Sequence, residues 1–218
     1  MKTIIFDLDG TILDTLEDLK NAVNYALRFY NLPETSLEFV RKAIGNGTQV
    51  LIKRCTPENI EDNKRKDVFN LFKTYYLSHY DDHTKPYAGI KEMLSDLKGK
   101  CLLVVISNKD NDLTQKLIKK EFPSLFDVIQ GSYMDKPKKP DPYLINKIIK
   151  EYSIDKSDCL YIGDTDVDKE SAQNAGLKYQ LVSYGYRNKE ELKKTCPNDM
   201  PLESVNELHN HVLKWVNL

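Results

Sequence analysis

The chain has 218 residues, of which 40% are hydrophobic and 30% charged, a composition typical of a soluble globular protein that excludes a disordered or fibrous chain. Its 32 basic and 33 acidic residues nearly balance, so no broad electrostatic field favours nucleic acid or an anionic lipid surface. The longest apolar run spans residues 101–106, whereas a membrane-spanning helix needs about 20 residues. We therefore expect neither a nucleic-acid nor a membrane partner.

The N-terminal residues do not fit a secretory signal, because the apolar stretch after Lys2 is short and soon meets Asp7 and Asp9. The four cysteines lie far apart in the sequence and form no Cys-x-x-Cys pair. This spacing is typical of reduced structural thiols, so we expect a cytoplasmic protein.

Short apolar runs alternate with helical patterns along most of the chain. The runs are continuous rather than alternating, which is typical of strands buried on both faces of a parallel sheet. We expect strands over residues 3–8, 101–107, 128–129, 159–163 and 180–183. The helical patterns between them cover residues 90–98, 113–121, 142–152 and 168–175. This alternation predicts an open α/β sheet with helices on both sides.

Residues 15–82 break this rhythm and contain no convincing strand. Apolar residues recur at helical spacing from Leu16 to Tyr30, and Asp14 with Glu17 resembles a capping box before that helix. Further helical patterns cover residues 37–44, 48–54 and 59–80. We therefore expect a helical insert that interrupts the α/β core just after its first strand.

Two of the expected strands end in carboxylates. The first ends in Asp7-Leu8-Asp9-Gly10-Thr11, where Gly10 lets backbone amides approach a ligand, and the fourth ends beside Asp164. Ligands of α/β sheets bind beyond the carboxyl ends of the strands, so these side chains face a functional edge. Hard oxygen ligands from separate strands suit Mg²⁺, which usually keeps waters and a substrate phosphate as well.

Polar and cationic residues follow in the other connections. The second strand ends in Ser107-Asn108-Lys109, and a lysine-rich loop at residues 136–142 precedes a helix that Asp141 caps. A carboxylate pair, a hydroxyl, a cation and a further carboxylate at successive strand ends are the groups that phosphoryl transfer needs.

These residues resemble the motifs of the haloacid dehalogenase superfamily of phosphohydrolases. Residues 7–11 match its first motif, and Ser107, Lys139 and the pair Asp164 and Asp168 match the next three, in the same order. The resemblance implies a Rossmann-like core formed by residues 1–14 and 83–218. It also implies that residues 15–82 form a small helical cap domain of the type called C1.

The resemblance further implies a two-step mechanism. Asp7 attacks phosphorus and forms an aspartyl phosphate, while Asp9 protonates the leaving oxygen and then activates water. Mg²⁺ is held by the Asp7 carboxylate, the backbone carbonyl of Asp9 and the Asp164 carboxylate. Because a dehalogenase needs no acid at the position of Asp9, a phosphatase or phosphomutase is favoured.

The phosphate oxygens are expected to bind to Gly10, Ser107, Asn108 and Lys139, with Asp168 orienting the lysine or a metal-bound water. Lys136 also precedes a proline, so it is the alternative to Lys139.

The substrate is expected to be a small phosphorylated metabolite. Residues 41–47, 107–109 and 182–187 resemble segments of phosphoglycolate phosphatases, which makes 2-phosphoglycolate the first candidate. A phosphomutase, a pyrophosphatase and a 5'-nucleotidase of the same superfamily remain open, as does, outside it, a receiver-type signalling module. The chain is expected to be a monomer or a homodimer.

Overall fold

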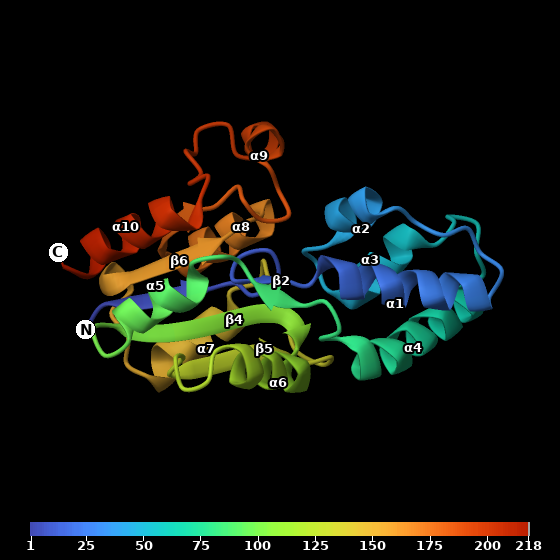
Figure 1. The fold of residues 1–218 in the computed structure, drawn as a ribbon, viewed down its shortest axis with the longest axis horizontal. Coiled ribbons are helices and arrows are strands. Elements are labelled where there is room, and N and C mark those ends of the chain that lie inside the picture. Colours follow the sequence, from blue (N-terminus) through green and yellow to red (C-terminus); the bar gives the residue numbers. More distant parts are fainter. Residues whose placement is uncertain (218) are drawn as a thin grey trace. The chain divides into compact units, whose positions relative to one another are not determined.

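Five parallel strands form one sheet in the order β5-β4-β1-β6-β7, in a computed structural model that describes residues 1–217 (Figure 1). The strands are β1 (Thr3–Phe6), β4 (Leu102–Asp110), β5 (Val128–Ser132), β6 (Cys159–Gly163) and β7 (Lys178–Leu181). The central strand β1 is buried along its whole length and pairs with β4 on one side and β6 on the other. The first two motifs and the fourth therefore lie at the ends of adjacent strands.

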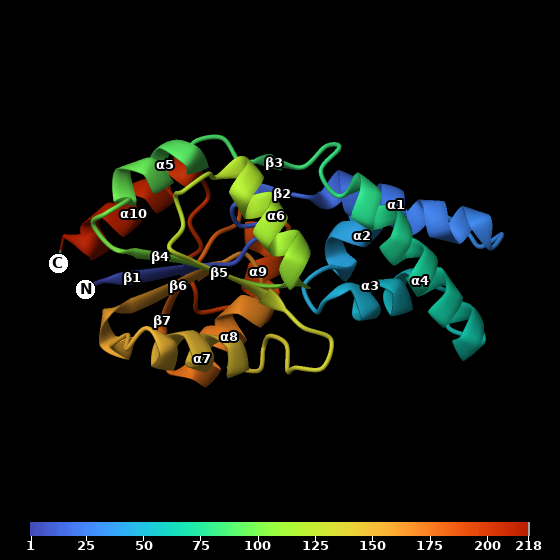
Figure 2. The same cartoon turned by 90° about the horizontal axis from the view of Figure 1, so that it is seen from below.

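Helices cover both faces of this sheet, which confirms the predicted α/β class and explains the continuous apolar strands. One face carries α5 (Ile90–Leu97), α6 (Asn111–Glu121) and α10 (Val205–Val216), and the opposite face carries α7 (Tyr143–Glu151) and α8 (Asp166–Ala175) (Figure 2). A short 3₁₀ helix, η1 (Lys156–Asp158), precedes β6, and α9 (Lys189–Thr195) follows β7.

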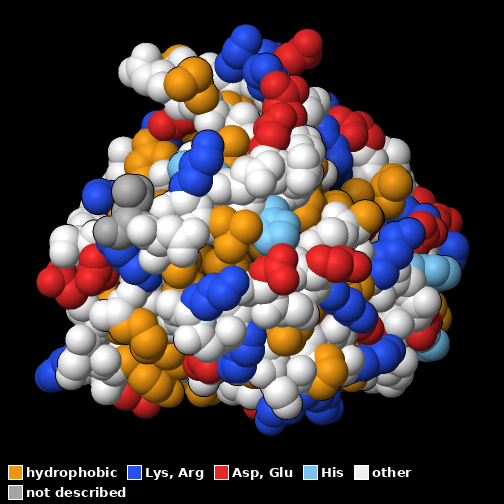
Figure 3. Space-filling view, turned by 60° about the vertical axis from the view of Figure 1, so that its left-hand side comes forward, with side chains coloured by type: hydrophobic (Ala, Val, Ile, Leu, Met, Phe, Trp, Pro, Cys, Tyr) orange, Lys and Arg blue, Asp and Glu red, His pale blue; other side chains and the backbone are white. Residues whose placement is uncertain are grey.

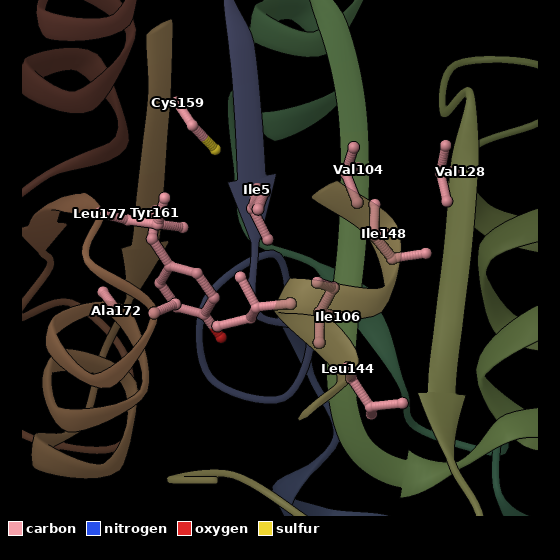
Figure 4. Packing of buried hydrophobic residues seen from close by; sticks show 12 residues of the cluster. Ile5, Val104, Ile106, Val128, Leu144, Ile148, Cys159, Tyr161, Ala172 and Leu177 are labelled. Carbon is pink, nitrogen blue, oxygen red and sulfur yellow. The ribbon is translucent and has the colours of Figure 1, made fainter. Parts of the chain in front are cut away.

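A buried apolar cluster joins the sheet to α7 and α8 (Figure 4). Ile5, Val104 and Tyr161 stand side by side in the register of the three central strands. Burying one aliphatic side chain of this size stabilises a fold by about 1.5–3 kcal/mol. The ring of Tyr161 runs along the sheet toward the carboxyl ends of the strands, so this residue belongs both to the core and to the edge described below.

The residues divide into two compact units, one of Met1–Leu13 with Pro86–Leu218 and one of Asp14–Lys85. The second unit contains α1 (Leu16–Phe29), α2 (Leu37–Ala43), α3 (Thr48–Cys55) and α4 (Asp62–His79), with α1 packed on α2 and α4. The chain passes between the units in β2 (Leu13–Asp14) and β3 (Lys85–Pro86), which pair with each other.

A buried carboxylate joins the two ends of the helical unit. Asp18 in α1 accepts hydrogen bonds from the backbone N–H groups of His83 and Thr84 and from the Thr84 hydroxyl, at distances of 2.8–3.1 Å. The last residues of the unit are thereby fixed to its first helix.

The start of α1 differs from the prediction. Thr15 is its N-cap residue and makes no capping hydrogen bond through its side chain, so the predicted capping box of Asp14 and Glu17 is wrong. Asp14 instead accepts the backbone N–H of Leu16, at 3.2 Å, in a local turn.

Among residues 1–217, no helix combines the length and the hydropathy that crossing a membrane requires. One face of the molecule shows basic and acidic side chains mixed together rather than gathered by sign (Figure 3). This mixing agrees with the net charge of −1.

All four cysteines are free and buried, and burial raises the pKa of the Cys159 thiol to about 12 and that of Cys55 and Cys101 to about 11. Because only the thiolate reacts, we expect Ellman's reagent near pH 8 to label none of these thiols within minutes in the native protein. All four should react in guanidinium. A native thiol that reacts within seconds would contradict this prediction.

Candidate active site

A buried ammonium group connects the end of β1 to the first turn of α8. Nζ of Lys139 lies 2.6 Å from Oδ1 of Asp7, which follows β1, and 2.7 Å from Oδ1 of Asp168 in α8. The side chains of Lys139 and Asp168 are 3% and 2% exposed, so water screens this ion pair little. Residues 132 positions apart in sequence thus meet in one charged cluster.

The hydroxyl of Tyr161 completes this cluster. It accepts a hydrogen bond from Nζ of Lys139 at 3.0 Å and donates one to Oδ1 of Asp168 at 3.2 Å. Burial raises the pKa of Tyr161 well above its usual value, so the hydroxyl keeps its proton and remains a donor. The sequence predicts Tyr161 only as a strand residue, although a tyrosine inside a buried strand requires a polar partner for its hydroxyl.

The loop before α7 presents Lys139, not Lys136, to the carboxylates. Lys136 is half exposed and pairs with Asp135 at 3.3 Å. The backbone of Lys139 is fixed by Asn108, whose side-chain amide donates to the Lys139 carbonyl at 3.0 Å and accepts its N–H at 2.8 Å. The structure therefore shows Asn108 holding the lysine loop, while its predicted contact with phosphate stays a prediction.

The orientation of Asp168 comes from the first turn of α8. Thr165 is the N-cap residue, and its backbone N–H and hydroxyl both donate to Oδ2 of Asp168, at 3.1 and 2.7 Å. This capping box fixes one carboxylate oxygen and directs the other at Lys139. Asp168 thus lies where the predicted orienting role needs it.

Burial and repulsion between carboxylates oppose the ionisation of Asp164 and Asp7. Burial, with the nearby Asp168, raises the pKa of Asp164 to about 7, and burial raises the pKa of Asp7 well above its usual value although Lys139 acts against it. For Lys139, burial acts to lower the pKa, but the carboxylates of Asp168 and Asp7 outweigh it and raise the pKa. The lysine is therefore charged at neutral pH.

Asp164 is fixed by a glycine-bearing loop that follows β1. Its carboxylate accepts the Thr11 hydroxyl at 3.1 Å and the Tyr186 N–H at 2.7 Å. Gly10 has a φ of +90°, and a Cβ there would press on the Asp164 carboxylate and lie 2.9 Å from the Tyr186 ring. Close packing therefore explains why this residue is glycine. The N–H of Gly10 donates to the Leu13 carbonyl at 2.8 Å.

The acidic cluster has the donor set of a divalent-cation site. Asp7, Asp164 and Asp168 each offer a carboxylate oxygen within 4.8 Å of the others. These are hard oxygen donors of the kind that Mg²⁺ prefers. Burial raises the pKa of Asp7 and Asp164. All three carboxylates also contact protein groups: Asp7 and Asp168 contact Lys139, and Asp164 contacts Thr11 and Tyr186. Which of them would bind a cation directly therefore stays a prediction.

A second lysine, at the end of β4, reaches a carboxylate in the loop that follows β1. The pairing register of β4 with β5 shifts between Ile106 and Asp110, and within this irregular stretch Ser107 Oγ accepts the Lys109 N–H at 3.1 Å. Nζ of Lys109 donates to Oδ1 of Asp9 at 2.9 Å. The structure thus places Ser107 at the predicted edge and adds Lys109 as a partner of Asp9.

A family model described as haloacid dehalogenase-like hydrolase matches residues 4–182 of the chain. The chain belongs to this family. A phosphoglycolate phosphatase of Aquifex aeolicus is 31% identical over 99% of this chain and 100% of its own length. Another from Caulobacter vibrioides is 33% identical over 93% of this chain and 86% of its own length.

The fold agrees with this assignment. A solved structure from Lactobacillus delbrueckii subsp. bulgaricus superposes with a TM-score of 0.89 and 28% identity, covering 97% of this chain and 99% of the other. The predicted superfamily is therefore confirmed, and so is the prediction of an enzyme of the phosphatase class.

The raised pKa of Asp164 predicts a pH-dependent stability. Without metal, the folded state holds a proton on Asp164 up to about pH 7, whereas an unfolded aspartate releases it near pH 4. Folding stability should therefore fall as the pH rises from about 4 to about 7. Mg²⁺ favours ionised carboxylates, so it should raise the melting temperature more near pH 8 than near pH 5.5.

Thermal unfolding of the chelated protein at both pH values, with and without Mg²⁺, measures this effect. Asp164→Asn is the control, because it removes one of the two carboxyls with a raised pKa and should weaken both dependences. An equal Mg²⁺ effect at the two pH values would contradict the prediction.

Proposed function

We propose that this chain is a Mg²⁺-dependent phosphatase that hydrolyses a small phosphomonoester through an aspartyl phosphate on Asp7. The observation that carries the proposal is the buried cluster of Asp7, Lys139, Asp168 and Asp164 at the ends of adjacent strands. A nucleophilic carboxylate, a fixed ammonium and oxygen donors for a cation are the parts that phosphoryl transfer requires.

In the first step, a carboxylate oxygen of Asp7 forms a bond to phosphorus while the ester P–O bond breaks. Asp9 gives its proton to the departing alkoxide, which leaves as an alcohol. Lys139 and Ser107 bind the phosphoryl oxygens, where negative charge must be stabilised. Lys139 is well suited to this role because Asp168 and Tyr161 fix its ammonium before any substrate arrives.

In the second step, water attacks the phosphorus of the aspartyl phosphate, and Asp9 accepts the proton of that water. The bond between Asp7 and phosphorus breaks, which releases inorganic phosphate, restores the carboxylate of Asp7 and leaves Asp9 protonated for the next cycle. Splitting the reaction in this way replaces one difficult displacement by two easier ones.

Asp7 and Asp164, with the backbone carbonyl of Asp9, are the proposed ligands of Mg²⁺. When bound, the ion supplies the charge neutralisation that lets an anionic nucleophile approach an anionic phosphate. The three neighbouring carboxylates support this assignment, because Asp164 and Asp168 act to raise the pKa of Asp7 and Asp168 acts to raise that of Asp164, effects that a second cation would oppose.

The curated relatives named above act as phosphoglycolate phosphatases, so 2-phosphoglycolate is the first substrate we propose. Residues 15–82 are proposed to act as a cap domain that helps to select the substrate. A cytoplasmic location is proposed with it, and the four buried free thiols support a reducing compartment.

A screen for released inorganic phosphate tests the proposal. We expect Mg²⁺-dependent release from 2-phosphoglycolate, lost with a chelator and restored by added Mg²⁺. Pyrophosphate, hexose phosphates and nucleoside monophosphates serve as the competing substrates. Isomerisation of a sugar phosphate with little free phosphate would instead identify a phosphomutase.

Two aspartate variants separate the two proposed steps. Asp7→Asn should abolish turnover and give no phosphoenzyme, since it removes the nucleophile. Asp9→Asn should slow turnover by about 10²- to 10⁴-fold, the usual contribution of general acid–base catalysis. Rapid acid quenching followed by mass spectrometry of the intact protein reports the phosphoenzyme, and normal turnover by Asp9→Asn would refute the assignment of Asp9.

A further inference from the structure

We propose that the Tyr161 hydroxyl occupies the N–H group of Lys139 that a phosphoryl oxygen takes over, so that hydroxyl and phosphate exchange when the substrate binds. This inference rests on the proposed function, because it takes Lys139 as a residue that binds the phosphoryl group. It adds to that function a positioning residue inside the sheet, which acts through the lysine and does not touch the substrate.

The Lys139 ammonium already has a full set of partners. Its Nζ lies 2.6 Å from Asp7, 2.7 Å from Asp168 and 3.0 Å from the Tyr161 hydroxyl. An ammonium group has three N–H donors, so three acceptors saturate it. A phosphoryl oxygen can therefore bind Lys139 only when one of these acceptors gives up its donor.

The backbone of Lys139 opposes a larger movement of the residue. The Asn108 side chain binds both the N–H and the carbonyl of Lys139, at 2.8 and 3.0 Å. The lysine side chain is 3% exposed and lies in a packed interior, where side chains have little room to change rotamer. We therefore expect phosphate to change the partners of the ammonium and not the position of the loop that carries it.

Tyr161 is the acceptor that can give up its donor most easily. Its oxygen is neutral and makes the longest of the three contacts, whereas hydrogen bonds from an ammonium to a carboxylate are roughly twice as strong as neutral ones. The Tyr161 hydroxyl also donates to Oδ1 of Asp168 at 3.2 Å. Because that bond remains after the exchange, the buried hydroxyl still has a partner.

The exchange gives Tyr161 opposite effects in the free and the bound protein. Without phosphate, its hydroxyl satisfies a buried N–H group of Lys139 and sets the direction of that group. When phosphate binds, the loss of this contact lowers the affinity for phosphate, including the inorganic phosphate that the second step releases. A residue that only anchored Lys139 would keep its contact in the complex and would raise the affinity instead.

Tyr161→Phe tests the exchange, because it removes the hydroxyl but keeps the ring, whose centroid lies 5.7 Å from Nζ of Lys139. In the presence of Mg²⁺, the affinity of this variant for inorganic phosphate should rise by about 2- to 10-fold, the usual value of one neutral hydrogen bond. Isothermal titration calorimetry measures this affinity.

Tyr179→Phe is the matched control. Tyr179 lies beside Tyr161 in the pairing register of the neighbouring strand β7. Its hydroxyl lies 2.8 Å from Asp199, a carboxylate that also pairs with a lysine, Lys169. Because this second group shares no residue with the catalytic cluster, the control variant should bind inorganic phosphate as tightly as the wild-type protein.

An unchanged or lower affinity in Tyr161→Phe would overturn the inference and leave the phosphatase assignment intact. Should this variant fail to fold, a crystal structure of the wild-type protein with Mg²⁺ and inorganic phosphate decides. It should place Nζ of Lys139 about 3 Å from a phosphate oxygen and more than about 3.5 Å from the Tyr161 hydroxyl, and a retained contact would overturn the inference. Failure of the proposed function looks different, because the wild-type protein would then release phosphate from no ester of the screen.

Discussion

The whole site depends on the contact between Lys139 and the carboxylates of Asp7 and Asp168. Placing these charges beneath the surface is costly, and the cost is offset only because each group meets an opposite charge at 2.6 or 2.7 Å. Removing one partner from such a buried pair usually costs about 3–5 kcal/mol, since the other charge remains buried. Each of these three charged groups therefore needs the others in place for its burial to be tolerated.

The parallel sheet makes this contact possible for residues far apart in sequence. Because β4, β1 and β6 run side by side in one direction, their carboxyl ends meet at one edge. Small irregularities at that edge then aim the side chains, as the shifted register of β4 does for Ser107 and Lys109. The regular parts of the strands bring distant residues to the same edge of the sheet, and the irregular strand ends set where their side chains point.

Much of this arrangement could be predicted from sequence, since continuous apolar runs reveal strands such as β6, and carboxylates after them reveal the functional edge. The prediction omits α9 and α10, although Asn188 with Glu191 forms a capping box before α9 and Leu208 and Val212 lie at helical spacing in α10. Tyr161 was missed since its hydroxyl acts through tertiary contacts with Lys139. The capping box was assigned to Asp14 because local spacing cannot show that tertiary packing sets where α1 begins.

Tyr161 has a consequence for how this chain can change. Its ring packs in the apolar cluster with Ile5 and Val104, while its hydroxyl contacts Lys139 and Asp168. A substitution that shifts the ring in the core therefore also disturbs the contacts of Lys139 and Asp168. At this residue, selection for stability and selection for activity act on the same side chain. A substitution here therefore changes both properties together.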